Sequence, residues 1–279
     1  MKPTHRALAG TTFRQFRLIA GLFVLATAAA HGATINTQWN FDDAGNATGS
    51  VANVGGYLGT FIGLTRSASG QGVSDIAGDY SLMMPGVGAG TMMDATTPAF
   101  LSALNTLTGT QSMSITYWQN LNAISNSTAF WGQSVSASGG RGLNAHSPWS
   151  DGNIYYDTAG CCTAGVHRLS GPLGAAIGQW ELITFVYDNG NKSIYRGTTL
   201  INSGAGFLPL TTDHTSFYVG NESFTQQLNP NARFDNFTLW NGALTPAEIA
   251  VLAVKPVPEP SVTVTLAGVL LAFCGRRRR

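Results

Sequence analysis

Charged residues are scarce in this chain. Only 10% of its 279 residues are Asp, Glu, Lys or Arg, against about 25% in an average soluble protein. Residues 1–32 and 256–279 together hold eight of the 15 basic residues and one of the 14 acidic residues. Residues 33–255 therefore carry a net charge near −6 and no cluster of Lys or Arg. Such a domain is a poor binder of nucleic acid, and no nucleic-acid partner is expected.

Glutamate is particularly rare, which argues against a glycosidase. Those enzymes need two carboxylates roughly 5 to 9.5 Å apart. The glutamates of the whole chain are Glu181, Glu222, Glu248 and Glu259. No Glu-x-Asp-x-Glu pattern occurs, and the adjacent Asp42 and Asp43 would point to opposite faces of a strand. The sequence thus predicts no catalytic residues and favours a protein that is not an enzyme. An enzyme acting on polysaccharide, a glycosidase or lyase, is the alternative.

The chain also lacks an apolar run long enough for a comfortable membrane span. Its two longest uncharged runs near the ends are residues 18–30 and residues 261–274. The second would form a helix of about 21 Å, against roughly 30 Å of hydrocarbon. The first follows Lys2, Arg6, Arg14 and Arg17 and ends in small residues. Residues 1–32 are therefore predicted to be a secretory signal peptide, with a retained membrane helix as the alternative.

The C-terminal residues 256–279 have three parts. Pro258, Glu259 and Pro260 form an extended segment, because each proline fixes its own φ and disfavours a helix before it. The short apolar run follows as a short transmembrane segment. The chain then ends in four basic residues, which the positive-inside rule retains in the cytoplasm: Arg276, Arg277, Arg278 and Arg279. A buried helix followed by solvated charges is the alternative.

This order of parts resembles the PEP-CTERM sorting signal of Gram-negative bacteria. The resemblance implies transient insertion into the inner membrane and processing by an exosortase, in a bacterium that makes exopolysaccharide. The mature protein would then reside at the cell surface or in the extracellular matrix. A eukaryotic lipid-anchor signal is the rival interpretation, but such signals end in their apolar tail.

The middle of the chain shows many short β patterns separated by turns rich in glycine, asparagine and aspartate. The expected strands are residues 35–41, 60–65, 80–84, 113–118, 180–187, 192–196, 217–220 and 234–240. Asn189 and Gly190 predict a hairpin turn. Thr245, Pro246 and Glu248 form a capping box that predicts one short helix near the C-terminus. Repeated strands without intervening helices predict an all-β fold, an antiparallel β-sandwich, over residues 33–255.

A second resemblance concerns this same domain. The segments QW at 179–180, DNGNK at 188–192, FYVGN at 217–221 and FDNFTLWNGALTPAEI at 234–249 are similar to laminin-G-like domains of the concanavalin A-like jelly-roll class. SITYWQN at 114–120 fits an earlier strand of that family, whereas Tyr195-Arg196-Gly197 departs from it. The resemblance implies a jelly-roll domain that binds carbohydrate, such as exopolysaccharide. A structural surface protein without a ligand is the alternative.

One stretch collects the residue types of a ligand-binding groove. The candidate residues are Arg141, His146, Trp149, Tyr155 and Tyr156. Binding pockets combine apolar walls with a few polar groups, although aromatic residues and a histidine also occur in ordinary cores. Tyr155 and Tyr156 must point to opposite faces of a strand, so one of them is expected to face outward. We expect at least two of the five side chains to be accessible within one shared concavity.

Two further features concern cofactors and cysteines. Asp235 lies on an apolar strand face and needs a partner, which is either a backbone N–H or arginine, or a structural calcium shared with Asp42 or Asp43. No other cofactor is expected. Cys161 and Cys162 are adjacent and allow three states: a ring between neighbours, a bond between molecules, or free thiols.

Overall fold

The computed structural model describes residues 32–88, 90–222 and 228–255. Apart from Gly32, the predicted signal peptide lies outside these residues, as do the Pro258-Glu259-Pro260 motif and the terminal arginines Arg276, Arg277, Arg278 and Arg279. Within the described ranges, no helix combines the length and the apolar character needed to cross a membrane.

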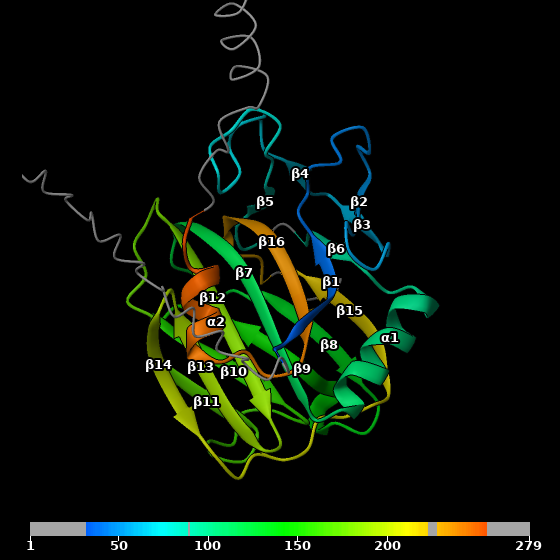
Figure 1. The fold of residues 1–279 in the computed structure, drawn as a ribbon, viewed down its shortest axis with the longest axis vertical. Helices are drawn as coiled ribbons and strands as arrows, with labels where there is room; N and C mark the ends of the chain where they lie inside the picture. The colour runs from blue at the N-terminus through cyan, green and yellow to red at the C-terminus, as the bar shows by residue number, and fades with distance from the viewer. Residues whose placement is uncertain (1–31, 89, 223–227, 256–279) are drawn as a thin grey trace, which may run out of the picture. The chain divides into compact units, whose positions relative to one another are not determined.

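The described residues form two eight-stranded sheets (Figure 1). The first sheet has the order β14 (Thr199–Gly204), β13 (Asn191–Arg196), β12 (Trp180–Asp188), β7 (Ser112–Ala123), β16 (Asn231–Asn241), β5 (Leu82–Pro85) and β4 (Thr65–Arg66), and β1 (Thr34–Trp39) also pairs with β16. The second sheet has the order β11 (Arg168–Pro172), β10 (Asn153–Thr158), β9 (Arg141–His146), β8 (Phe130–Ser134), β15 (His214–Val219), β6 (Met92–Asp94), β3 (Leu58–Ile62) and β2 (Gly49–Val51). Every pair of neighbouring strands in these sheets is antiparallel, which confirms the predicted sandwich.

The core lies between the two sheets and follows from alternation along the strands. On β7, Met113, Ile115 and Tyr117 are fully buried in the core, as the period of two predicted. The predicted central strand is β12, which pairs with β7 on one side and β13 on the other. Its Phe185 contacts Phe130 of the opposite sheet, with ring centroids 5.4 Å apart. Aromatic packing of this kind joins the two layers.

The predicted hairpin connects β12 and β13. Asp188 pairs with Asn191, and the two turn residues Asn189 and Gly190 have φ values of 47° and 83°. Positive φ at both central positions is the geometry that Asn-Gly adopts most readily. A Cβ atom at Gly190 would also come within 3.1 Å of the Phe207 carbonyl oxygen.

We expect Gly190→Val to lower the free energy of unfolding by roughly 1–2 kcal/mol, because a β-branched residue is strained at positive φ. Urea titration measures this change. Gly206 is the matched control, since it has a φ of 84° and no atom within 4 Å of an added Cβ. With alanine at both positions, Gly190→Ala should therefore lower the free energy of unfolding by more than Gly206→Ala does. Equal losses would show that the Phe207 contact contributes nothing.

Helix α2 (Pro246–Leu252) has the predicted capping box. The Thr245 hydroxyl accepts from the Glu248 N–H at 3.3 Å, and the Glu248 carboxylate accepts from the Thr245 N–H at 2.8 Å. Ile249 is fully buried and packs with Trp240 and Val186. The helix therefore covers the outer face of the first sheet, in front of β12 in Figure 1.

The sequence-based prediction was wrong about one helix and one strand, and it also missed strands β2, β6, β8, β9, β11 and β14. Helix α1 (Pro98–Gly109) was not predicted, although Thr97 caps it and Pro98 opens it. Phe100 occupies the position where α2 has its glutamate, so the reciprocal half of a capping box is missing. The strand expected over residues 60–65 is two strands, β3 and β4, which belong to different sheets because the chain turns at Gly63, with a φ of 64°.

Candidate functional site

A cavity of about 270 Å³ opens at β9 and β10 of the second sheet. Its lining comprises Arg141, His146, Trp149, Asp151, Tyr155, Cys162, Arg168, Glu222 and Leu228. The structure therefore brings together four of the five predicted candidates. Trp149 and Tyr155 are half-buried, and the side chain of Arg141 is 22% exposed. His146 and Tyr155 face each other across the β9–β10 pair.

Tyr156 does not belong to this cavity. Its side chain is fully buried in the core, where its ring lies 5.1 Å from that of Phe185. Neighbouring residues of a strand point to opposite faces, so the outward position of Tyr155 forces Tyr156 inward. Tyr156 is thereby removed from the set of candidate ligand contacts.

A buried carboxylate fixes the two arginines of the cavity. Asp157 is fully buried and binds Arg168 through both of its oxygens, with Arg168 Nε 2.7 Å from Oδ1. Arg141 Nη1 lies 4.0 Å from Asp157 Oδ2, and Arg141 Nη2 lies 3.9 Å from Glu222 Oε1. Such pairing compensates the cost of burying a carboxylate. Before any ligand arrives, Arg168 is thus oriented by hydrogen bonds to Asp157, and Arg141 is oriented by the longer ion-pair contacts.

Each guanidinium group also covers an aromatic ring. Arg168 Cζ lies 4.4 Å from the centre of the Tyr155 ring, and Arg141 Cζ lies 4.9 Å from the Trp131 ring. Cations are attracted to ring faces at such distances. The arginine side chains are therefore held by contacts with ring faces as well as by charge. Their remaining N–H groups are left as donors for a ligand.

His146 supplies an acceptor. Its Nδ1 lies 2.9 Å from the carbonyl oxygen of Ser127, so Nδ1 carries the proton and donates to that oxygen. Burial lowers the pKa of His146 to about 4, so the ring is neutral at physiological pH. Nε2 is then an acceptor, and the amide nitrogen of Asn144 lies 3.5 Å from it. The imidazole edge contacts Trp149, with ring centroids 4.7 Å apart.

Two carboxylates line the cavity, and neither was predicted as a site residue. Asp151 is exposed and accepts from the Tyr155 hydroxyl and from the Asn153 N–H, and these bonds lower its pKa. Glu222 is buried, and this burial raises its pKa against the opposing effect of Arg141. The two acids thus have different environments within one cavity.

Three other residues of the site also escaped prediction: Cys162, Arg168 and Leu228. Arg168 pairs directly with Asp157 across β10 and β11, a signal that is readable once these strands are known to be neighbours. Cys162 lies on the loop that joins the two strands. Leu228 and Glu222 come from beyond β15, and no local pattern connects them to the cavity.

The aspartates considered for calcium fit such a site only in part. Asp235 is fully buried and accepts from the N–H groups of Val73 and Asn236, at 2.7 and 2.6 Å, and burial raises its pKa to about 8. Asp43 Oδ1 accepts from Arg66 and Ser50, and its Oδ2 accepts from the Val51 N–H at 2.8 Å, so both oxygens already have partners. Asp42 accepts from the Tyr80 N–H at 2.9 Å and lines a separate hollow.

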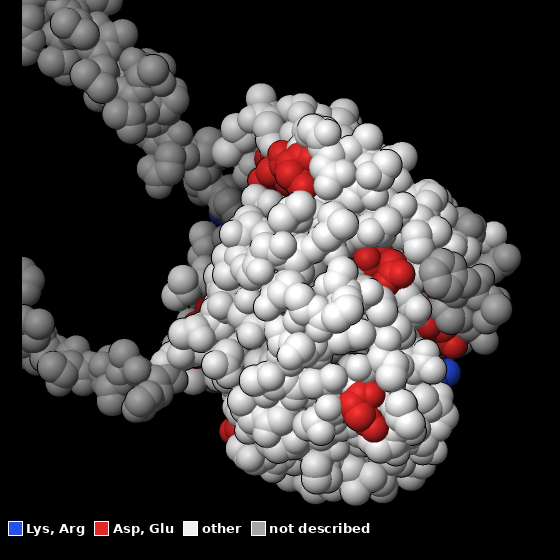
Figure 2. Space-filling model, turned by 90° about the vertical axis from the view of Figure 1, so that its right-hand side faces the viewer, with Lys and Arg blue, Asp and Glu red and all other residues white. Residues whose placement is uncertain are grey.

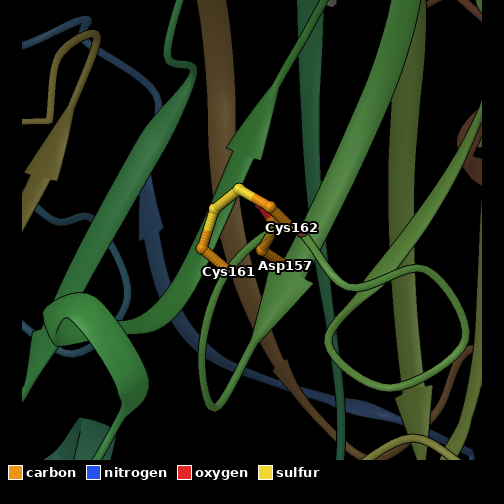
Figure 3. A group of neighbouring side chains, drawn as sticks. All are labelled: Asp157, Cys161 and Cys162. Atoms are coloured by element: carbon orange, nitrogen blue, oxygen red, sulfur yellow. A yellow bond between two sulfur atoms is a disulfide. The ribbon is translucent and has the colours of Figure 1, made fainter.

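Among the described residues, one group of three potential metal ligands has its ligand atoms within 4.8 Å of one another: Asp157, Cys161 and Cys162. The two sulfur atoms are joined as a disulfide between neighbouring residues (Figure 3). Of the three states that the sequence allowed, the structure has the ring. Because Asp157 is bound to Arg168, none of these atoms is free to bind a metal ion.

The visible surface in Figure 2 is mostly uncharged. Acidic residues stand apart from one another on this face, and Lys and Arg are nearly absent from it. This agrees with the charge distribution of the sequence, since no basic patch is present there to follow a phosphate backbone.

The comparisons with known proteins concern this domain. Residues 94–250 match the family model described as the concanavalin A-like lectin/glucanases superfamily, which supports the laminin-G-like resemblance. No curated protein sequence matches the chain.

Solved structures share the fold at low sequence identity. Domain 4 of AbnA, an extracellular arabinanase from Geobacillus stearothermophilus in complex with arabinotriose, is 16% identical with a TM-score of 0.57, over 80% of this chain and 99% of that one. Trypanosoma rangeli sialidase in complex with sialic acid is 13% identical with a TM-score of 0.55, over 78% of this chain but 32% of the sialidase. The botulinum neurotoxin type G receptor-binding domain is 11% identical with a TM-score of 0.53, over 80% and 51%. At these identities the likeness concerns the fold alone.

Proposed function

The chain belongs to the concanavalin A-like lectin/glucanases superfamily, and from this premise we propose that it binds carbohydrate in the cavity at β9 and β10. The observation that carries the proposal is the combination of aromatic walls with two pre-oriented guanidinium groups in one cavity of about 270 Å³. Pockets for drug-sized ligands measure about 300–1,000 Å³. The cavity therefore suits a short saccharide or the end of a longer one. The arabinanase domain crystallised with arabinotriose supports this choice of ligand class.

The groups of the cavity match the two kinds of surface on a sugar. Trp149 and Tyr155 offer ring faces and edges to the C–H side of a pyranose or furanose ring. Arg141 and Arg168 donate to hydroxyl oxygens, whereas Glu222 and Asp151 accept from hydroxyl groups. The positive charge of the two arginines is already balanced by Asp157, Glu222 and Asp151. Uncharged sugars are therefore the favoured class.

A printed glycan array probed with the full-length chain tests the proposal. We expect binding to uncharged oligosaccharides, and at least tenfold weaker binding by Trp149→Ala, because truncation of a central tryptophan that acts as a hot spot typically costs about 2 kcal/mol or more and about 1.4 kcal/mol is tenfold in affinity. Trp180→Ala is the control, since Trp180 is partly buried but does not line the cavity. Binding that survives Trp149→Ala, or no binding to any glycan, would refute the assignment.

A polysaccharide-active enzyme is the second candidate, and the two carboxylates of the cavity favour it. General acid–base catalysis uses one acid with a raised pKa and one with a lowered pKa, and Glu222 and Asp151 are shifted in these directions. A measurement of newly formed reducing ends decides between binding and hydrolysis. Release of sugar that is lost in Glu222→Gln would replace the binding proposal with an enzymatic one.

We also infer that the protein is exported and sorted through its C-terminal segment. The support is the sequence of residues 256–279, in which Pro258-Glu259-Pro260, an apolar run and four arginines follow one another at the end of the chain. An exosortase would be the processing partner, and the cell's exopolysaccharide would be a ligand available at the surface.

Mass spectrometry of the surface or secreted fraction tests this inference. The mature protein is expected to end near Pro258 and to lack the terminal arginines. Alanine at Pro258, Glu259 and Pro260 should leave uncut precursor in the inner membrane, whereas alanine at Val262, Thr263 and Val264 should not abolish recognition of the motif. Intact C-terminal arginines in the surface fraction would contradict processing.

A further inference from the structure

The disulfide between Cys161 and Cys162 has no cross-linking role. It joins residues at a sequence separation of 1, with Cα atoms 3.7 Å apart (Figure 3). A disulfide stabilises a fold chiefly by closing a loop of the unfolded chain, and its effect grows with the length of that loop. This one encloses no intervening residue and connects no two elements of the sandwich. Its influence must therefore be local, on the loop between β10 and β11.

That loop has a backbone conformation that ordinary residues avoid. Ala159 and Cys162 have φ values of 54° and 76°. Residues other than glycine adopt such values where the surrounding structure imposes them. A covalent ring at 161–162 is one such constraint. A second is the hydrogen bond from the Ala159 N–H to the carbonyl oxygen of Gly142 at 3.0 Å, which ties the loop to β9.

The loop places the sulfur atoms beside the candidate site. Cys162 is exposed and lines the same cavity as Trp149 and Tyr155. Cys161 Sγ lies 3.9 Å from Arg168 Nη2, and Arg168 covers the Tyr155 ring. The disulfide therefore adjoins both an aromatic wall and one of the two oriented guanidinium groups.

We propose that the Cys161–Cys162 disulfide forms part of the wall of the saccharide-binding cavity, and that the cavity binds its ligand tightly only while this disulfide is closed. The inference rests on the proposed carbohydrate-binding function. Cysteine sulfur is polarizable and behaves as a small apolar group, and the C–H face of a sugar ring is an apolar surface that can pack against it. The closed ring holds the sulfur atoms in one position. Two free thiols rotate independently and release the constraint on Cys162.

The switch is a balanced two-electron reaction. A thiolate of a dithiol reductant attacks one sulfur and forms a mixed disulfide, and its second thiol then completes the exchange. The products are two cysteine thiols and the oxidised reductant, so two electrons and two protons pass to the protein. Cytosolic thiols are kept reduced, whereas exported proteins retain their disulfides. An exported chain would therefore acquire full binding only after it leaves the cytoplasm.

The first test needs no ligand. In the full-length chain with Cys274→Ser, dithiothreitol acts on one disulfide, and alkylation followed by mass spectrometry reports its state. The Arg168 Nε–H resonance should shift on reduction, because that side chain contacts Cys161. Arg66 is the matched control, since its Nε donates to the Phe41 carbonyl oxygen at 2.7 Å, away from the cavity. An unmoved Arg168 resonance, with the disulfide shown to be open, overturns the proposal.

The second test measures binding on the glycan array. Oxidised chain, reduced chain and the double variant Cys161→Ser, Cys162→Ser are compared, and the unshifted Arg66 resonance verifies that each is folded. We expect at least tenfold weaker binding for the reduced and double-serine forms, and recovery of the reduced form on reoxidation. Equal binding by all three, with loss in Trp149→Ala, overturns the redox inference and leaves the proposed function intact. Absence of binding by every form overturns both.

Discussion

Replacing Asp157 with asparagine is expected to lower the free energy of unfolding by about 3 kcal/mol or more. Asp157 is fully buried, and it binds Arg168 through two oxygens while Arg141 lies 4.0 Å away. Removing one partner of a buried ion pair typically lowers the free energy of unfolding by about 3–5 kcal/mol, because the remaining charge is left without its partner. The partly exposed arginines regain some hydration, which places the expected value at the lower end.

The asparagine side chain makes this substitution severe although its shape is nearly unchanged. Its amide group would point N–H donors at guanidinium N–H donors, so at least one contact becomes repulsive. Urea denaturation of Asp157→Asn measures the loss. Asp75→Asn is the matched control, since Asp75 forms an exposed ion pair with Lys255 and should cost under about 1 kcal/mol.

A double variant distinguishes the ion pair from other effects of the substitution. Combining Asp157→Asn with Arg168→Met removes both charges of the central pair. The double variant should lose less stability than the sum of the two single variants, because neither charge remains unpaired. Additive losses would show that Asp157 and Arg168 act independently, and that the arginines of the cavity are held by something other than this carboxylate.

The parts of the fold that could be predicted are those encoded locally. Alternation along residues 113–118 specified the core face of β7, and the uninterrupted apolar pattern of 180–187 specified the central position of β12. Asn189 and Gly190 specified the hairpin, and the Thr245–Glu248 box specified α2. Each of these signals lies within a few residues of the feature that it predicts, so no tertiary information is required.

The missed features depend on pairing between distant segments. Helix α1 buries Phe100 against Trp39 and Phe217, and these contacts, rather than a complete capping box, identify it. The strand boundary at Gly63 separates two sheets, which a single linear pattern cannot show. Packing between elements often decides such cases against local preference.

The candidate site shows the same division. The sequence predicted that the side chains of Tyr155 and Tyr156 point to opposite faces of a strand, and the structure shows that Tyr155 is the one that faces the cavity. Arg168 and Glu222 join the site only because β11 lies beside β10 and because the chain after β15 returns to it. The sequence therefore predicts the central residues of the site. The charged residues beside them can be identified only when the order of the strands in the sheet is known.

Lys192 shows how a local pattern can place a charge in the core. It follows the hairpin turn, where a lysine is usually solvated, but it shares the inward face of β13 with Ile194. Only 1% of its surface is exposed, and its Nζ donates to the carbonyl oxygens of His167 and Tyr156 at 2.6 and 3.3 Å. The ammonium group also lies over the rings of Tyr156 and Phe207.

The stability of the domain should consequently rise with pH in a window set by Lys192. Burial lowers the pKa of Lys192 from 10.5 to about 7 in the folded state. Between these values the unfolded chain binds one proton more than the folded chain, so the free energy of unfolding increases by up to about 1.4 kcal/mol per pH unit. Below pH 7 both states are protonated and the full cost of burying the charge is present.

Urea titrations at pH 8.5 and 9.5 test this expectation, because both values lie above the pKa of about 8 for Asp235. The free energy of unfolding of the wild-type chain should be higher at pH 9.5 by roughly 1 kcal/mol. Lys192→Met should abolish this rise in stability, whereas Lys255→Met, at an exposed lysine, should preserve it. A wild-type chain whose stability is unchanged or falls between these pH values would show that Lys192 is not buried as a charge-sensitive group.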